Sequence, residues 1–428
     1  MRMPHFPTAP WKQNIQYNLV NINRLLGILN NPHLKLPPVI HIAGTNGKGS
    51  SVAMFKSIFQ KAGYTVHTYT SPHLLEVNER IVIRGEKISD QFLFEVCERV
   101  RIASLQENIE PSFFEGITAA ACLAFAEVKA DILILETGLG GRLDATNIVA
   151  SPLITLITPI SYDHMQQLGN TLPAIASEKA GIIKPNIPCV ISCQVEEVYQ
   201  VLLAKCQDLN APAFCYEYDF CIKKNADNFT YLSKNANHQF SFPCLLGDHQ
   251  LINAGAVIAA ISLINTRFNI TNGNIERGLQ NINWPARLQK MSFGKYSHLA
   301  GEHVQIWLDG AHNSAGAQVL SAWIADNLKP PVYLILGMTK NRNVEDFCLH
   351  LKRLTVKGYG VRVLSEVMSY SSETISHRGN AVGIEFVPSD SLEDAIREIS
   401  NLKQARTNII ITGSLFLAAD FLKLIEAA

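Results

Sequence analysis

The chain has 428 residues, 47% of them hydrophobic and 17% charged, a composition that excludes a disordered chain and favours a globular one. Its 37 basic and 37 acidic side chains give zero net charge, whereas a nucleic-acid binder usually carries a basic surplus. No uninterrupted apolar run reaches the roughly 18 residues of a membrane span, so we expect none. A small-molecule substrate fits this composition best.

The nine cysteines are scattered and form no CxxC pair, a pattern typical of reduced, buried thiols. The first residues, MRMPHFPTAPWKQ, contain no long apolar run, so we expect no secretory signal. Both features predict a cytoplasmic protein. At roughly 150 residues per domain, the length predicts two or three domains.

Short apolar runs alternate with amphipathic segments through the first half of the chain. Apolar strands separated by helices are typical of a parallel sheet covered on both faces, which binds ligands at the carboxyl ends of its strands. The predicted strands are 39–43, 65–70, 131–137, 152–158 and 188–192, and the predicted helices are 51–63, 89–105, 117–130 and 172–183.

The second half of the chain begins differently and then repeats the alternation. Residues 210–246 show no helical period and predict a small β excursion, and a helix follows at 253–264. We place a domain boundary after residue 290. The prediction is an α/β protein with two domains: a P-loop-type, mostly parallel sheet with helices on both faces at 1–290, and a smaller Rossmann-like domain at 291–428. The predicted strands of the second domain are 305–310, 332–337, 360–366 and 408–413.

The strongest chemical motif lies between the first strand and the first helix. Its glycines let backbone N–H groups turn toward an anion, and the helix N-terminus adds positive potential. Lys48 is expected to reach the phosphates of ATP, and Ser50 to hold Mg²⁺. Ile42 stands where a P-loop has its first glycine, so an ordinary strand–helix turn is the alternative. The predicted ATP-binding residues here are Gly44, Thr45, Asn46, Gly47, Lys48, Gly49 and Ser50.

Polar residues also follow two further strands. Ser71 is a candidate metal ligand and His73 a candidate substrate contact, although Ser-Pro is also a common turn. Glu136 ends an apolar strand, and a carboxylate there suits Mg²⁺, which prefers oxygen ligands. In the glycine-rich loop that follows, Arg142 is a candidate clamp for a carboxylate, and a surface loop capped by Asp144 is the alternative.

Several other polar residues are ambiguous by residue type alone. A lone histidine is more often structural than a ligand, and charged neighbours on a helix are usually solvated. Aspartate and histidine at a strand end are as consistent with loop capping as with binding. The residues in this group are Asp163, His164, Glu178, Lys179, Asn253, Arg287, Asp309 and His312.

Taken together, the motifs resemble the folylpolyglutamate synthase and dihydrofolate synthase family in its bifunctional bacterial type, which is related to the Mur ligases. The matching segments keep the family order along nearly the whole chain, and GLGGRLDATN is the most specific of them. They are HIAGTNGKGS (41–50), TSPHL (70–74), SFFEGIT (112–118), ETGLGGRLDATN (136–147), DHMQQLGNTLPAIASEKAGIIKP (163–185), LLGDHQLINAGAVIAA (245–260), WPARLQ (284–289), LDGAHNSAGA (308–317) and ITGSLFL (411–417).

The resemblance implies a reaction. MgATP phosphorylates a carboxylate to an acyl phosphate, and the amine of L-glutamate attacks it to give an amide, ADP and phosphate. The implied acceptors are dihydropteroate, which becomes dihydrofolate, and the γ-carboxylate of tetrahydrofolate, which becomes polyglutamylated. The resemblance also identifies 1–290 as an ATP-binding domain similar to the central Mur ligase domain, and 291–428 as the ligase domain. A monomer without nucleic-acid or membrane partners is implied.

Residue roles follow from the same resemblance, position by position. Two Mg²⁺ ions are implied, and Lys179 occupies a position that is often carbamylated in this family, which would turn it into an anionic metal ligand. The implied catalytic residues are Lys48, Lys179, His164 and Glu136, and the implied metal ligands are Ser50, Ser71, Glu136, His164 and carbamylated Lys179. Asn253, Arg287 and Asp309 are implied nucleotide contacts, and His73, Gly140, Arg142, Asp144, His312 and Ser414 are implied substrate contacts.

Some positions depart from the family pattern and leave alternatives open. Ser314 stands where proline is common, and the segment 338–343 reads MTKNRN where an acidic DKD-like sequence is usual. A monofunctional synthase is one alternative, and a Mur-type ligase acting on a UDP-sugar peptide is another. A nucleotide-dependent switch without ligase chemistry is a third, although intact Lys48, Glu136 and His164 argue against it.

Overall fold

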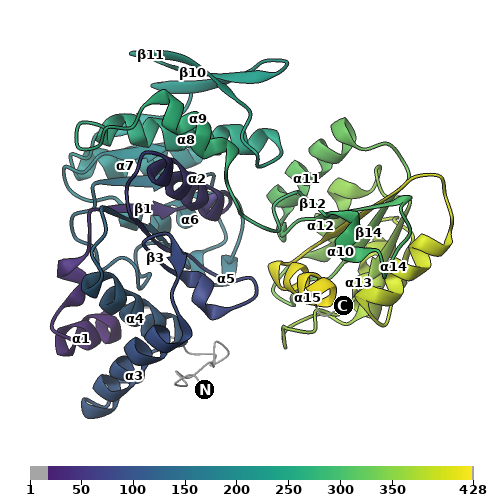
Figure 1. Cartoon of the computed structure of the whole chain (residues 1–428), viewed down its shortest axis with the longest axis horizontal. Coiled ribbons are helices and arrows are strands. Elements are labelled where there is room, and N and C mark those ends of the chain that lie inside the picture. The colour runs from purple at the N-terminus through teal and green to yellow at the C-terminus, as the bar shows by residue number, and fades with distance from the viewer. Residues whose placement is uncertain (1–17, 427–428) are drawn as a thin grey trace. The chain divides into compact units, whose positions relative to one another are not determined.

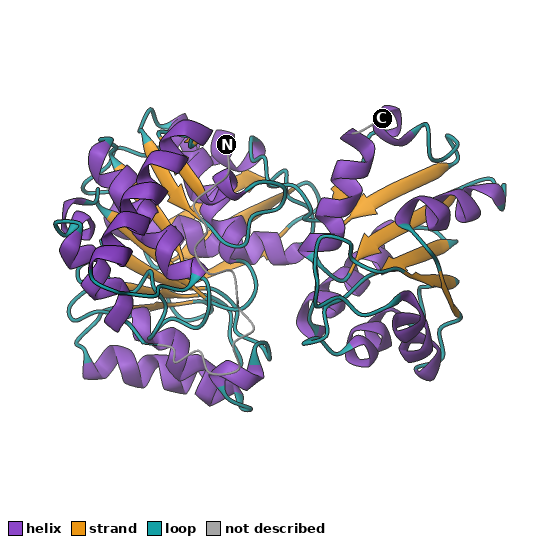
Figure 2. Ribbon diagram, turned by 90° about the horizontal axis from the view of Figure 1, so that it is seen from below, coloured by secondary structure: helices purple, strands orange, loops and turns teal. Residues whose placement is uncertain are grey.

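The computed structural model describes residues 18–426, which form two compact units. Unit 1 consists of the described residues up to Ser161 together with Met165–Cys244 and Gln250–Asn283. Unit 2 consists of Tyr162–His164, Leu245–His249 and the described residues from Trp284 onward. Each is an α/β unit built on its own sheet (Figures 1 and 2). The predicted fold class is therefore confirmed.

Unit 1 contains an eight-stranded sheet in the order β4-β3-β2-β5-β1-β6-β7-β8. The six strands from β2 to β8 in that order are parallel, and five of them confirm the five strands predicted for this part of the chain. The sixth, β8, lies in the stretch predicted as a β excursion but joins this parallel sheet instead. Two short antiparallel strands, which the sequence did not predict, extend one edge. The bounds are β1 Val39–Ala43, β2 Val66–Tyr69, β3 Ile81–Ile83, β4 Glu86–Lys87, β5 Ile132–Glu136, β6 Ile154–Ile157, β7 Cys189–Ile191 and β8 Ala213–Cys215.

Helices cover both faces of this sheet, because alternate residues of each fully buried strand point to opposite sides. Apolar side chains of α1, α3 and α4 pack on one face, and those of α6 and α7 continue that layer. Helix α2 contacts β1, β2 and β5 and packs against α9. The bounds are α1 Val20–Ile28, α2 Lys48–Lys61, α3 Asp90–Gln106, α4 Phe113–Glu127, α5 Met165–Leu168, α6 Leu172–Lys179, α7 Glu196–Asp208, α8 Asp248–Ile264 and α9 Asn272–Gln280.

The predicted β excursion is a three-stranded antiparallel sheet of β9 Phe220–Lys224, β10 Asn228–Ser233 and β11 Ala236–Ser241. It lies beside α8 and α9 in Figure 1, and β11 contacts α9. Gly255 of α8 allows the close approach, since a Cβ there would lie 2.6 Å from a side-chain carbon of Ile222. This small sheet therefore packs against α8 and α9 as part of unit 1.

Unit 2 contains a six-stranded sheet in the order β12-β13-β17-β14-β15-β16, parallel except for β12. Helices α11, α12 and α13 bury their apolar side chains in one cluster with β14 and β17, while α14 and α15 contact these same two strands. The bounds are β12 Gln289–Lys290, α10 Phe293–Tyr296, β13 Val304–Leu308, α11 Ser314–Asn327, β14 Val332–Leu336, α12 Val344–Leu351, β15 Lys357–Gly360, α13 Ser372–Ala381, β16 Phe386–Pro388, α14 Leu392–Asn401, β17 Thr407–Thr412 and α15 Leu415–Glu426.

Several predicted boundaries were wrong, among them the starts of α4 and α8, which begin at Phe113 and Asp248 instead of residues 117 and 253. The helix predicted from residue 51 begins at Lys48, because Gly47 adopts φ of +91° and turns the chain into the helix. The strand predicted at 360–366 is β15, which ends at Gly360. Beyond it the backbone N–H groups of Val363 and Leu364 donate to the side chains of Ser369 and Asp420, so they pair with loop and helix residues instead of a strand.

Within residues 18–426, no helix is long and apolar enough to cross a membrane.

A buried polar network joins β1 to the glycine-rich loop. The Asp144 carboxylate accepts hydrogen bonds from the backbone N–H groups of Gly138, Leu139 and Thr146 at 2.7–2.9 Å. The Thr146 hydroxyl donates its one proton to Asp144 at 2.5 Å, so the 3.0 Å contact with His41 Nε2 must have the imidazole as donor. Asp144 thus organises its own loop, and His41 ties that loop to the strand that carries the phosphate-binding motif.

This network predicts an acid-sensitive fold. Burial, assisted by the positive charge of Lys184, lowers the pKa of His41 to about 3. The unfolded chain takes up a proton on this imidazole below about pH 6.5, while the folded chain does not until about pH 3. The free energy of unfolding therefore falls as the pH drops through this window, by up to about 1.4 kcal/mol per pH unit. His41→Gln keeps a donor toward Thr146 but does not titrate.

We expect urea unfolding to show that the wild type loses about 2 kcal/mol more than His41→Gln between pH 7.5 and pH 5. The same substitution at the exposed His298 controls for the loss of one histidine. Equal losses in the wild type and His41→Gln would contradict the assignment of a neutral, donating imidazole.

Candidate functional site

The loop 44–50 follows the carboxyl end of β1 and is held rigidly. The backbone N–H groups of Thr45 and Asn46 donate to the carbonyl of Pro159, and the Thr45 hydroxyl donates to the carbonyl of Ser161 at 3.1 Å. Glycine is required at Gly44, where a Cβ would lie 1.9 Å from the Thr158 hydroxyl oxygen. The loop thus has a fixed shape before any ligand arrives, as an anion-binding loop requires.

Two lysine side chains converge on the carbonyl oxygen of Gly44. Lys179 Nζ donates to it at 2.7 Å, and Lys48 Nζ donates to it at 3.1 Å and to the carbonyl of Thr45 at 3.2 Å. Lys179 is buried, and desolvation, reinforced by the charge of Lys48, lowers its pKa well below the usual value. The Lys179 amine is therefore biased toward its neutral, nucleophilic form.

Helix α8 supplies the other side of this loop. A Cβ on Gly47 would lie 2.5 Å from Asn253 Oδ1, so the amide lies against the loop as the predicted nucleotide contact requires. Asn253 Nδ2 donates to Gln250, whose own amide donates to the hydroxyl of Ser50 at 3.3 Å. The structure thus brings Asn253 to the loop and links it to Ser50 through Gln250, which the sequence did not single out.

The glycine-rich loop after β5 packs directly on the segment that carries Lys179. A Cβ on Gly181 would lie 2.3 Å from the Arg142 Cα, and one on Gly141 would lie 2.8 Å from the Lys179 carbonyl oxygen. The Arg142 guanidinium pairs with the Glu178 carboxylate at 2.8 Å. The Arg142 side chain is more than half exposed. These contacts explain why glycine occupies both segments, and Gly140, at φ of +67°, turns the same loop.

The charged side chains of this glycine-rich loop, Asp144 and Arg142, each have a hydrogen-bond partner within unit 1. Asp144 uses both carboxylate oxygens within the loop, which gives it a structural task. Burial raises its pKa, and the hydrogen bonds that it accepts oppose that shift. Arg142 has a carboxylate partner on α6, so any substrate carboxylate must compete with Glu178 for it.

Glu136 is buried at the carboxyl end of β5, opposite Ile42 of β1 in the strand register. Its Oε2 accepts the backbone N–H of Ser71 at 3.3 Å, so the two predicted metal residues are brought together. Arg80 is a further residue here, which the sequence did not reveal. It is buried, donates to His73 Nδ1 at 2.9 Å and interacts electrostatically with Glu136. Burial lowers the pKa of Arg80.

The donor set fits Mg²⁺ better than a softer metal. Ser50, Ser71 and Glu136 offer oxygen atoms, and among residues 18–426 no group of three or more His, Cys, Asp or Glu side chains is arranged to hold a metal ion. A magnesium–nucleotide complex usually takes one or two protein carboxylates and fills its other positions with phosphate and water. These residues therefore fit a metal that arrives with ATP.

Unit 2 carries the remaining predicted residues at the carboxyl ends of its strands. Asp309 follows β13 and accepts the backbone N–H groups of Leu288 and Ala311, each at 2.8 Å. Burial raises the pKa of Asp309, and the nearby Arg287 opposes that shift. Ser414 follows β17 and is buried, and its hydroxyl accepts the N–H of Phe416 at 3.0 Å. Arg287 and Asp309 are thus brought together.

A second cluster of unit 2 surrounds the buried carboxylate of Asp163. His312 Nε2 lies 3.5 Å from Asp163 Oδ2, and the amide of Asn313 donates to the same oxygen at 3.2 Å. The Arg342 guanidinium forms an ion pair with Oδ1, and its other nitrogen lies 3.4 Å from His164 Nε2. The sequence placed Asp163, His164 and His312 among the ambiguous candidates but did not predict that Arg342 would join them.

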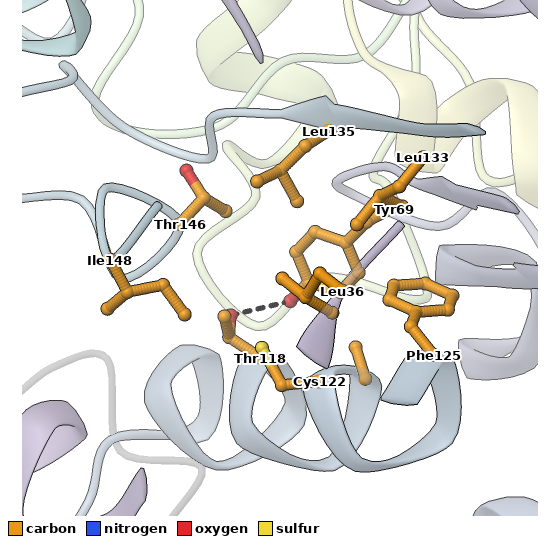
Figure 3. A pocket seen from close by; sticks show the side chains of 10 residues that line it. Leu36, Tyr69, Thr118, Cys122, Phe125, Leu133, Leu135, Thr146 and Ile148 are labelled. Atoms are coloured by element: carbon orange, nitrogen blue, oxygen red, sulfur yellow. Dashed lines mark hydrogen bonds between the residues drawn. The ribbon is translucent and has the colours of Figure 1, made fainter. Parts of the chain in front are cut away.

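An apolar pocket lies inside unit 1 (Figure 3). Thr118 and Cys122 of α4 face Tyr69 and Leu36 across it, and the Tyr69 and Thr118 hydroxyls are hydrogen-bonded at 2.8 Å. No charged side chain lines it, so it offers nothing to hold a phosphate or a carboxylate. Its residues are Leu36, Tyr69, Thr118, Ala121, Cys122, Phe125, Leu133, Leu135, Thr146 and Ile148.

Comparison with known proteins agrees with this architecture. The family model of the Mur ligase middle domain matches residues 42–261, and that of the dihydrofolate synthetase C-terminal domain matches residues 289–424. The dihydrofolate synthase/folylpolyglutamate synthase of Bacillus subtilis is 33% identical over 434 residues, 96% of each chain. The folylpolyglutamate synthase of Lacticaseibacillus casei is 31% identical over 407 residues, 92% of this chain and 91% of the relative.

A solved structure is also similar along nearly the whole chain. The folylpolyglutamate synthase of Mycobacterium tuberculosis, complexed with ADP and AMPPCP, matches with a TM-score of 0.85 and 27% identity, covering 95% of each chain. Sequence, family models and fold therefore agree. The chain belongs to the dihydrofolate synthase/folylpolyglutamate synthase family of the Mur ligase superfamily and is an ATP-dependent ligase that forms amide bonds.

Proposed function

We propose that this ligase joins L-glutamate to dihydropteroate, forming dihydrofolate, and to the γ-carboxylate of tetrahydrofolate, forming polyglutamates, through an acyl phosphate. The observation that carries the proposal is the convergence of Lys48 and Lys179 on the Gly44 carbonyl, next to the strand that ends in Glu136. The Bacillus subtilis relative is named for both activities. Residues 1–290 are proposed as the ATP-binding domain and 291–428 as the ligase domain.

The chemistry follows from the residue types. Transfer of a phosphoryl group to a carboxylate needs positioning and charge stabilisation, which the backbone N–H groups of the loop and the ammonium group of Lys48 provide. Mg²⁺ would neutralise the phosphates, with Ser50, Ser71, Glu136 and His164 as the proposed ligands. Asn253, Arg287 and Asp309 are proposed nucleotide contacts, and His312 and Ser414 are proposed contacts for glutamate. His73, Gly140, Arg142 and Asp144 are proposed to line the folate side.

A monomer in the cytoplasm, acting on small molecules and not on nucleic acid, remains our expectation.

Steady-state ADP release with MgATP and L-glutamate tests the function, with dihydropteroate and tetrahydrofolate compared as acceptors. We expect turnover with both, and we expect Lys48→Ala to lower kcat at least 100-fold because it removes a cation that stabilises the transferred phosphoryl group. Lys61→Ala, at the exposed end of the same helix, is the matched control and should leave kcat unchanged.

Turnover with one acceptor alone would replace the bifunctional assignment with a monofunctional synthase. Turnover with neither, in a protein that still binds ATP, would overturn the proposal. A UDP-sugar peptide as the successful acceptor would then indicate a Mur-type ligase, and no turnover with any acceptor would favour a nucleotide-dependent switch.

We also infer that Lys179 is carbamylated and contributes to a second Mg²⁺ site. Its amine is buried and biased toward the neutral form, which attacks CO₂ to give a carbamate and release a proton. The product is an anion, which would balance the charge of Lys48 and offer oxygen atoms to a metal. The buried location also protects a carbamate from water.

This inference predicts a new carbonyl signal in ¹³C NMR after the protein is equilibrated with ¹³C-bicarbonate. Lys179→Met should abolish the signal, whereas Lys184→Met should retain it. Lys184 is a suitable control because it is a partly buried lysine whose pKa is also lowered by burial. A spectrum that is the same for the wild type and Lys179→Met would show that Lys179 is not modified.

A further inference from the structure

The carboxylate of Asp163 is bound on all sides. Its Oδ1 accepts the backbone N–H of His164 at 2.7 Å and pairs with the Arg342 guanidinium. Its Oδ2 accepts the amide of Asn313 at 3.2 Å and lies 3.5 Å from His312 Nε2. A buried carboxylate needs a cation and hydrogen-bond donors to offset its lost hydration. Arg342 is the permanently charged member of this set, so the cluster depends on it.

His164 has a strained backbone. Its φ is +50°, in the left-handed region that few residues other than glycine occupy. Such a conformation costs free energy and persists only where its surroundings determine it. The hydrogen bond from the His164 N–H to Asp163 Oδ1 is the local restraint that favours it. The contacts that hold the Asp163 carboxylate in place therefore also hold the backbone and imidazole of His164.

Arg342 is itself held in place. It lies in the loop between β14 and α12, and its side chain is 13% exposed. The Tyr370 hydroxyl donates to the carbonyls of Lys340 at 3.1 Å and Arg342 at 3.4 Å. The Lys340 N–H donates to the Met368 carbonyl at 2.7 Å. The guanidinium is thus presented from a fixed loop, with one nitrogen on Asp163 and another 3.4 Å from His164 Nε2.

We propose that Arg342 is a positioning residue for metal binding, acting through Asp163 to hold His164 in its left-handed backbone conformation and to orient its imidazole. This inference rests on the metal-binding role proposed for His164. The planar, two-pronged guanidinium contacts the carboxylate and the ring together, which the single ammonium group of lysine cannot reproduce. The segment 338–343, which departs from the family pattern, thus has the role of presenting Arg342 to Asp163 and His164.

The experiment measures Mn²⁺ affinity by electron paramagnetic resonance, with the protein saturated with AMPPNP, for the wild type, Arg342→Ala, Arg342→Lys and Asp163→Asn. Residues that orient a metal ligand typically change affinity 10- to 100-fold, so we expect Arg342→Ala to weaken Mn²⁺ binding about 10-fold or more. Arg342→Lys should restore part of this loss. Arg362→Ala, an exposed arginine of the same unit, is the matched control and should leave the affinity unchanged.

The double variant Arg342→Ala/Asp163→Asn should bind Mn²⁺ about as weakly as Arg342→Ala alone, because both changes break one chain of contacts. Additive losses would overturn the proposal, as would an unchanged Mn²⁺ affinity in both Arg342 variants. If Arg342→Ala fails to fold, Arg342→Lys decides: it must weaken Mn²⁺ binding while AMPPNP binding persists. A change confined to KM for glutamate would also overturn the proposal, because it would indicate a direct substrate contact.

These readouts separate the inference from the proposed function. A wild type that turns over both acceptors, with Mn²⁺ affinity independent of Arg342, would retain the function and reject the inference. A wild type that turns over neither acceptor, with Mn²⁺ affinity that depends on Arg342, would reject the function and retain the positioning role.

Discussion

The carbonyl oxygen of Gly44 is the point on which the proposed ATP site depends, because the side chains of Lys48 and Lys179 both donate to it. Two amines at one oxygen repel each other when both are charged, and burial penalises the charge of Lys179 further. That repulsion disappears if Lys179 loses its proton or is converted to an anionic carbamate. The modification proposed for Lys179 thus follows from this electrostatic constraint.

Close backbone contacts make this convergence possible. Gly44 lies against Thr158, Gly47 against Asn253 and Gly181 against Arg142, each too close for a side-chain carbon. The glycine-rich loop, the loop 44–50 and the segment carrying Lys179 therefore pack tightly against one another within unit 1. The network from His41 through Thr146 to Asp144 adds a polar tie between the glycine-rich loop and β1, the strand that precedes the loop 44–50. Rigid packing of this kind preorganises charge for phosphoryl transfer.

Much of this could be predicted from the sequence, for physical reasons. Buried parallel strands are continuous apolar runs, so they can be recognised in the sequence. The glycines and Lys48 that follow β1 form a pattern typical of a phosphate-binding loop. The contact of Lys179 with Gly44 joins residues 135 positions apart, so spacing could not reveal it, and only the family resemblance pointed to Lys179. Arg80 and Arg342 were missed because an arginine's burial depends on tertiary packing, which leaves no local pattern.

The central claim is that ATP activates the acceptor carboxylate by phosphorylating it. The direct measurement uses dihydropteroate labelled with ¹⁸O in its carboxylate, incubated with MgATP and L-glutamate, and follows the label by mass spectrometry of the inorganic phosphate. An acyl phosphate transfers one carboxylate oxygen to phosphate when the amine of glutamate displaces it, so we predict one ¹⁸O atom in each phosphate released. Unlabelled phosphate formed together with dihydrofolate would contradict this account of the site.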